Sequence, residues 1–203
     1  MLDSRVRKLI DKPLDVVGKK LGLFGVTANS VTIFGFISGI LSIIFIANDS
    51  LNYALLFLCL NRLSDGLDGA VARASKLSDF GVFLDIVSDF IIYSGIVFAF
   101  AIRDTSVALY AAFLIFSFVG PITLFLAYAI IAAKKDVNTV KRGKKSFYYL
   151  GGICEGTETA FILILMCIMP SIFAEICVVY GILCWLTTAG RVYATWHDFA
   201  KNS

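Results

Sequence analysis

The sequence predicts an all-α integral membrane protein with six transmembrane helices preceded by an amphipathic N-terminal surface helix. Of its 203 residues, 59% are hydrophobic and only 16% are charged, and the mean hydropathy is +0.85. Six long apolar segments alternate with short polar connections. Such a composition excludes an ordinary soluble domain and is typical of a protein that crosses a membrane several times.

The first 28 residues are predicted to lie on the membrane surface as an interfacial arm. Apolar residues recur there at near-helical spacing with basic residues between them, which is typical of a helix that binds a membrane interface. Pro13 is expected to interrupt this helix. A disordered basic arm is the alternative. No signal peptide is expected, because the segment lacks a continuous apolar core.

The six apolar segments are each long enough to cross a hydrocarbon core of about 30 Å. They cover residues 29–48, 51–74, 80–102, 106–133, 147–169 and 171–196. Their connections are too short to hold a soluble domain. We therefore predict one domain over residues 1–203, made of the interfacial arm at 1–28 and a six-helix bundle at 29–203.

Basic residues predict the orientation of the bundle. Seventeen of the 18 lysines and arginines fall in the arm, in the second-to-third and fourth-to-fifth connections, or at the C-terminal end, which all lie on one side of six spans. Cytoplasmic segments are the ones enriched in Lys and Arg. We therefore expect both termini at the cytoplasmic face of the inner membrane, where the basic charge suits anionic lipids better than nucleic acid.

An acidic motif lies within these apolar segments. Its four carboxylates are Asp65, Asp68, Asp85 and Asp89. Spacings of three and four residues place each pair on one helix face. Each carboxylate costs roughly 2.5 to 3.5 kcal/mol at the centre of a bilayer, and Arg73 and Lys76 are the only basic residues inside the motif. A cation is therefore expected as the partner.

The donor set predicts which cation this is. Carboxylate oxygens suit Mg²⁺ or Mn²⁺, and four of them predict a two-metal site of the kind that acts on phosphates. A single histidine and the lack of a CxxC pair argue against a zinc site.

Two glycines and an arginine flank the carboxylates. Gly69 and Gly81 are expected to leave room for a ligand beside them, although small residues also serve close helix packing in membranes. Arg73 is expected to bind phosphate oxygens, or else to extend to the membrane interface.

The motif resembles the signature of the CDP-alcohol phosphotransferases. DGLDGAVAR, seven residues and GVFLDIVSD match the pattern D-x-x-D-G-x-x-A-R, seven or eight residues, G-x-x-x-D-x-x-x-D at every fixed position. The resemblance extends to the six-helix layout and the surface helix. It implies a homodimeric enzyme in which a hydroxyl attacks the phosphorus of a CDP-linked alcohol and releases CMP.

The resemblance also implies roles for the motif residues. It makes Asp65, Asp68 and Asp85 metal ligands, gives Asp89 both a metal-binding and a general-base role, and places Gly69, Arg73 and Gly81 in the CDP pocket. The stretch that ends at Asn29 is similar to a Thr-Pro-Asn element of the family, with alanine in place of proline. Asn29 is accordingly expected near the nucleotide, or as a helix N-cap.

A second polar region is expected to serve the acceptor. Glu155 and Glu158, three residues apart in the fifth segment, would either pair with Arg191 of the sixth segment or shape an acceptor pocket. Lys144 and Lys145 precede the fifth segment and, with Arg191, could hold an anionic acceptor. Their basic charge is also explained by topology alone.

We therefore predict a phosphatidyltransferase of phospholipid biosynthesis. It would move a phosphatidyl group from CDP-diacylglycerol, supplied by the membrane, to a small polar acceptor, with glycerol 3-phosphate or another polyol phosphate as the leading candidate. One alternative is a CDP-aminoalcohol donor acting on diacylglycerol. From other classes, an intramembrane cation or proton transporter and a catalytically inactive scaffold remain.

Overall fold

The computed structural model describes residues 3–75, 78–134 and 154–200, and this part of the chain is helical and contains no strand. Its long helices are α1 (Asp3–Leu23), α2 (Ala28–Ala47), α3 (Leu51–Ala74), α4 (Asp79–Arg103), α5 (Ala108–Lys134), α7 (Gly156–Ile168) and α8 (Phe173–Ala200). Two short 3₁₀ helices, η1 (Thr105–Val107) and η2 (Pro170–Ile172), precede α5 and α8. The all-α prediction is confirmed, and the first three predicted spans agree with α2, α3 and α4 to within one residue.

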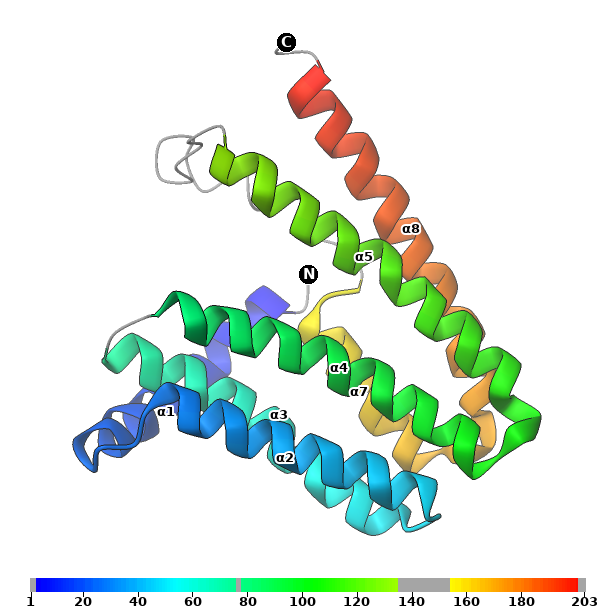
Figure 1. The fold of residues 1–203 in the computed structure, drawn as a ribbon, viewed down its shortest axis with the longest axis horizontal. Helices are drawn as coiled ribbons and strands as arrows, with labels where there is room; N and C mark the ends of the chain where they lie inside the picture. Colours follow the sequence, from blue (N-terminus) through cyan, green and yellow to red (C-terminus); the bar gives the residue numbers. More distant parts are fainter. Residues whose placement is uncertain (1–2, 76–77, 135–153, 201–203) are drawn as a thin grey trace.

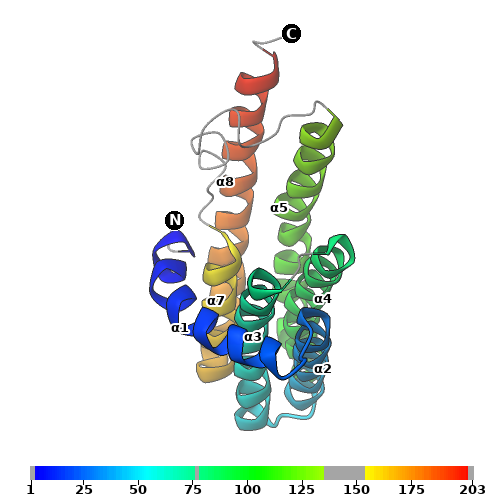
Figure 2. The ribbon, with the colours of Figure 1, turned by 90° about the vertical axis from the view of Figure 1, so that its left-hand side faces the viewer.

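The helices form a bundle that α1 crosses at one end. Helix α3 packs against α2, α1 and α7, and α4 packs against α2 and α5, while α5 and α8 pair with each other. Figure 1 shows α2, α3, α4 and α7 running side by side, with α5 and α8 leaving them at an angle toward their C-terminal ends. Figure 2 shows α1 lying across the ends of α2 and α3.

Helix α1 runs without a break through Pro13, so the expected interruption of the arm is wrong. The helix nevertheless changes direction along its length in Figure 2, as a proline that removes one backbone hydrogen bond allows. Gly25, with φ of +79°, ends the turn that leads from α1 toward α2. A side chain is strained in that backbone conformation, so glycine suits this position.

Local sequence explains where α2 and α4 begin. The Thr27 hydroxyl accepts a hydrogen bond from the backbone N–H of Ser30, and the Ser78 hydroxyl accepts one from Gly81. Both residues therefore act as N-caps. Helix α2 then buries a stripe of small residues, Gly35, Ser38, Gly39 and Ser42 among them, against its neighbours, which lets membrane helices approach closely.

Four helical stretches are long and apolar enough to cross a membrane, namely Ala28–Ala47, Asp79–Arg103, Thr105–Ile131 and Pro170–Trp196. Helix α3 matches them in length with 24 residues but is polar in its second half, and α7 has 13 residues. Residues 147–153 of the fifth predicted span lie outside the described part. The chain is thus a multi-pass membrane protein, and the count of six spans stays a prediction.

The apolar core fills the half of the bundle away from the acidic motif. It is built from the end of α2, the start of α3, the second half of α4, and the starts of α5 and α8, with α7 beside them. Phe100 and Phe173 stack there with ring centroids 4.6 Å apart. The opposite half holds the motif, so the bundle has an apolar end and a polar end.

Candidate active site

Three motif carboxylates, two from α3 and one from α4, lie close together. One oxygen each from Asp65, Asp68 and Asp85 lies within 4.8 Å of the others. The group contains oxygen donors only, and Asp68 is 6% exposed. Asp65 and Asp85 are partly buried, and carboxylates this close together repel one another unless a cation offsets their charge. The donor set therefore fits a hard divalent cation such as Mg²⁺ or Mn²⁺.

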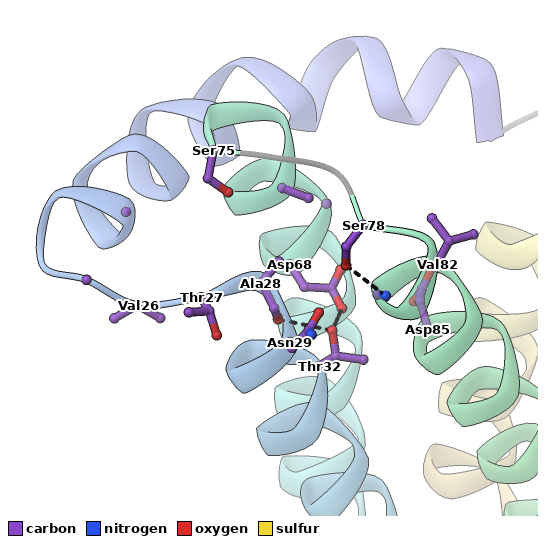
Figure 3. Close-up of a pocket in the computed structure, with 15 residues that line it drawn as sticks. Val26, Thr27, Ala28, Asn29, Thr32, Asp68, Ser75, Ser78, Val82 and Asp85 are labelled. Carbon is purple, nitrogen blue, oxygen red and sulfur yellow. Dashed lines mark hydrogen bonds between the residues drawn. The ribbon is translucent and has the colours of Figure 1, made fainter.

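Thr32 of α2 contacts this carboxylate group. The Thr32 hydroxyl donates a 2.6 Å hydrogen bond to Asp68 Oδ2. Figure 3 shows this bond, with Asp85 facing the same space from the first turns of α4. Thr32 follows Asn29 by three residues on the same helix face. The sequence analysis missed it, although continuing the helical period from Asn29 would have found it.

The fourth carboxylate has different neighbours. Asp89 Oδ1 accepts a 2.8 Å hydrogen bond from Arg62 Nη2, and Asp89 Oδ2 accepts a 2.9 Å hydrogen bond from the Tyr93 hydroxyl. Asp89 does not belong to the three-carboxylate group. Asp89 is instead paired with Arg62. Its double role as metal ligand and general base stays a prediction.

Arg62 is the main residue that the sequence analysis overlooked. It lies outside the motif, within which Arg73 and Lys76 are the basic residues. Arg62 precedes Asp65 by three residues, and Tyr93 follows Asp89 by four. Both therefore extend the motif's own helix faces by one turn, which is the signal that could have identified them.

A first cavity, of about 440 Å³, opens at the end of the bundle that α1 crosses. It is bounded by the α1–α2 turn, the start of α2, the end of α3 and the start of α4 (Figure 3). Of the predicted nucleotide-binding residues, Asn29, Gly69 and Gly81 line it, together with the metal-site residues Asp68 and Asp85.

Two details of this cavity refine the sequence expectations. Thr27 caps α2, so the alternative role of Asn29 as the N-cap is wrong. A Cβ atom at Gly81 would lie 2.9 Å from Asn29 Oδ1, too close for ordinary contact. Glycine at position 81 thus lets the Asn29 side chain face the cavity beside α4.

Arg73 is turned toward α1. Its Nε and Nη2 atoms both donate to Asp15 Oδ1, at 3.0 and 2.7 Å, and Asp11 lies 3.8 Å from Nη2. The side chain of Arg73 is 44% exposed. The arginine therefore joins the motif helix to the surface helix, a role that was not among the two expected for it.

A second cavity, of about 580 Å³, lies between α4, α5, α7 and α8. Its walls are largely apolar, and its polar lining consists of Asp85, Asp89, Tyr93, Tyr128, Glu155, Thr159 and Arg191. Among the residues that the structure describes, Asp85 is the one that lines both cavities. Asp85 of the carboxylate group thus borders both cavities, Asp68 borders the first and Asp65 borders neither.

The predicted acceptor residues fall into two sets. Arg191 Nη2 lies 3.7 Å from Glu155 Oε1, and both residues line the second cavity. Glu155 is therefore a counter-ion of Arg191, as one of its two expected roles requires, and it also lines a cavity. That this cavity holds an acceptor stays a prediction. Glu158 is not among the described residues that line this cavity. Lys144 and Lys145 lie outside the described residues.

This chain is similar in sequence to a known protein family and to individual members of it. Residues 25–193 match the CDP-alcohol phosphatidyltransferase family. The chain is 41% identical over 194 residues to the inner membrane protein YnjF of Escherichia coli, covering 95% of this chain and 92% of that protein. It is 30% identical over 193 residues to the archaetidylinositol phosphate synthase of Pyrococcus horikoshii, covering 94% of each.

The fold has a solved counterpart. A crystal structure of Mycobacterium tuberculosis phosphatidylinositol phosphate synthase (PgsA1) with CDP-DAG bound superimposes with a TM-score of 0.70, at 18% identity, over 90% of this chain and 93% of that one. The transporter alternative is wrong, because the matched family consists of transferases. The chain belongs to the CDP-alcohol phosphatidyltransferase family.

Proposed function

We propose that this enzyme transfers a phosphatidyl group from CDP-diacylglycerol to a hydroxyl of a polyol phosphate, with glycerol 3-phosphate as the first candidate, and releases CMP. The observation that carries the proposal is the carboxylate group between two cavities, with Asp85 lining both. A donor in one cavity and an acceptor in the other would meet at the same three carboxylates.

The first cavity suits the donor. It lies beside the surface helix, where a lipid-linked nucleotide can enter from the membrane, and Asn29, Gly69 and Gly81 line it. The solved counterpart carries CDP-DAG, which supports a CDP-linked lipid here. Arg73 would leave Asp15 and bind phosphate oxygens, since a guanidinium forms two parallel hydrogen bonds to phosphate as readily as to carboxylate.

The second cavity suits the acceptor. Arg191 offers a fixed positive charge for the acceptor's phosphate, and Glu155 and Thr159 offer oxygens that can accept hydrogen bonds from polyol hydroxyls. The archaeal relative is named for an inositol phosphate product, which supports a polyol phosphate. Lys144 and Lys145 are proposed to add positive charge to this side.

The proposed reaction needs a residue that accepts the proton of the attacking hydroxyl. The acceptor's hydroxyl oxygen forms a bond to the phosphorus that carries diacylglycerol, its proton passes to Asp89, and the bond from that phosphorus to the bridging oxygen breaks. The electron pair of the broken bond stays with CMP. Asp89 lines the acceptor's cavity, as a general base for that hydroxyl must.

The chain offers ligands for the cofactor that the motif implies. Asp65, Asp68 and Asp85, with Asp89 as a further candidate, would hold two Mg²⁺ or Mn²⁺ ions. When bound, the ions would supply positive charge that offsets the charge of the diphosphate and of the departing CMP. Thr32 keeps Asp68 oriented. We retain the cytoplasmic orientation and the homodimer as further parts of the proposal.

The test is a product analysis with purified enzyme. CDP-diacylglycerol is offered with glycerol 3-phosphate, inositol phosphate or serine in parallel, and CDP-ethanolamine is offered with diacylglycerol. CMP release and the mass of the lipid product are measured with and without a chelator. We expect a phosphate-bearing lipid in a polyol phosphate arm, abolished by chelation and restored by Mg²⁺ or Mn²⁺. Product only from serine, or only from the CDP-ethanolamine arm, would overturn the proposal.

A further inference from the structure

A buried arginine outside the signature, Arg62, contacts the last motif carboxylate. Its side chain is 11% exposed. Its Nη2 atom donates to Asp89 Oδ1 at 2.8 Å, and its Nη1 atom donates to the Tyr93 hydroxyl at 2.7 Å. The guanidinium carbon lies 4.8 Å from the centre of the Tyr93 ring. Arg62 comes from α3 and the other two residues from α4, so these contacts join the two helices that carry the motif.

Asn61 holds the Arg62 guanidinium in place. The Arg62 Nε and Nη2 atoms donate to the side-chain oxygen of Asn61 at 2.8 and 2.6 Å. The Asn61 amide donates in turn to the backbone oxygen of Gly35 on α2 at 2.9 Å. All three guanidinium nitrogens are therefore engaged within the protein, which fixes the group in place and leaves it poorly available to a substrate phosphate.

Asp89 is fixed by the same contacts but remains able to react. Arg62 occupies one of its oxygens and the Tyr93 hydroxyl the other. Each carboxylate oxygen has a second lone pair, so Asp89 can still accept a proton from a hydroxyl in the second cavity, which it lines. To join Asp65, Asp68 and Asp85, it would have to give up a charge-assisted hydrogen bond and leave a buried guanidinium without its nearest counter-ion.

We propose that Arg62 and Tyr93 form a clamp that positions Asp89 toward the acceptor's cavity and keeps it out of the metal-binding carboxylate group. On this inference Asp65, Asp68 and Asp85 would hold the metal, and Asp89, named above as a further candidate ligand, would not. The inference rests on the proposed function, because it takes Asp89 as the base of that reaction. Arg62 lines neither cavity and acts through its 2.8 Å contact with Asp89, with Asp65 farther away at 3.9 Å, so it is a positioning residue.

The experiment compares Arg62→Gln, Arg62→Lys and Tyr93→Phe with the wild-type enzyme. Arg103→Gln is the matched control, since it removes an arginine that pairs with Asp49 at the opposite end of α4. Four quantities are measured for each: thermal unfolding, Mn²⁺ binding, CDP binding, and single-turnover CMP release at saturating acceptor. The first three report on the site without requiring turnover.

In Arg62→Gln we expect CMP release to slow by about 10- to 100-fold, because misplacing a reacting group by 1 Å can cost about 10²-fold. Mn²⁺ should bind as tightly as in the wild type or more tightly, since a positive charge is removed and Asp89 is released. CDP binding should be unchanged. Arg62→Lys should recover part of the rate, because an ammonium can pair with Asp89 but cannot also bridge to Tyr93 and Asn61.

Two results would overturn the clamp. One is a wild-type rate in Arg62→Gln, and the other is a loss of Mn²⁺ binding, which would make Arg62 a general support of the site. If Arg62→Gln does not fold, Tyr93→Phe decides, because it removes a single hydroxyl, and an unchanged rate there contradicts the proposal. A wild-type enzyme that releases no CMP with any acceptor would instead refute the proposed function, and the Mn²⁺ comparison would still test the clamp.

Discussion

Asp85 and Asp89 are one helical turn apart, yet their carboxylates have different partners. Asp85 lies with Asp65 and Asp68, whereas Asp89 is bonded to Arg62 and Tyr93. Sequence spacing alone places both on one face of α4. The difference arises because the side chains that α3 presents change from carboxylates to a guanidinium over one turn.

Replacing Asp89 by asparagine tests its role as a base. Asparagine keeps an oxygen that can accept from Arg62, so we expect CDP binding to stay within a few-fold while turnover falls by about 10² to 10⁴, the usual cost of losing a general base. Equilibrium CDP binding with Mg²⁺ and single-turnover CMP release measure the two effects. Asp104→Asn, at the other end of α4, is the control. A parallel collapse of CDP binding would make Asp89 a structural ligand.

Replacing Arg191 by glutamine tests the acceptor's cavity. Arg191 is the cation among the described residues that line this cavity, so its loss should raise the KM for an anionic acceptor by about 10-fold or more, given that a hydrogen bond to a charged group contributes about 1.5 to 3 kcal/mol. The KM for CDP-diacylglycerol should hardly change. Steady-state kinetics with each substrate varied in turn would show this. An equal rise in both values would contradict separate cavities.

At the scale of elements, helix α1 is fastened to the motif helix at two points. Gly18 packs against the backbone of Ala70 and Val71, and Asp15 accepts both hydrogen bonds from Arg73. The surface helix thus borders the first cavity as part of the bundle. The boundaries of α2, α3 and α4 were predictable because apolar length follows bilayer thickness. The contact between Arg73 and Asp15 could not be predicted, because it joins residues 58 apart in the sequence.

Substituting Gly18 by alanine tests this attachment. The added Cβ would lie 2.7 Å from the backbone carbon of Ala70, which cannot move aside as a side chain can. We expect α1 to shift and the enzyme to lose about 1 to 3 kcal/mol of stability, as overpacked sites do. Gly22→Ala is the control on the same helix, where nothing lies within 4 Å. Thermal unfolding in one detergent compares them, and equal melting temperatures would contradict the close contact.

Over the whole molecule, the first cavity lies at the end of the bundle away from the apolar core, whereas the second cavity borders the core through Tyr93, Phe118, Cys154 and Cys184. The sequence predicted the chemistry of the polar half, because the spacing of its aspartates is specific. It could not predict the second cavity, whose walls come from α4, α5, α7 and α8, since α5 and α8 diverge from α4 in a way that their sequences do not reveal (Figure 1). Nor could it predict that Glu155 and Arg191 would share a wall with Asp89, because three different helices contribute to that wall.

In the described part of the chain the two cavities share Asp85 and otherwise have separate linings, which has a kinetic consequence. CMP bound in the first cavity would exclude CDP-diacylglycerol but leave the second cavity free for the acceptor. We therefore expect product inhibition by CMP to be competitive toward CDP-diacylglycerol and noncompetitive toward the polyol phosphate. Initial rates at several CMP concentrations, with each substrate varied in turn, distinguish the patterns. Competitive inhibition by CMP toward both substrates would mean that the two substrates bind in one shared cavity.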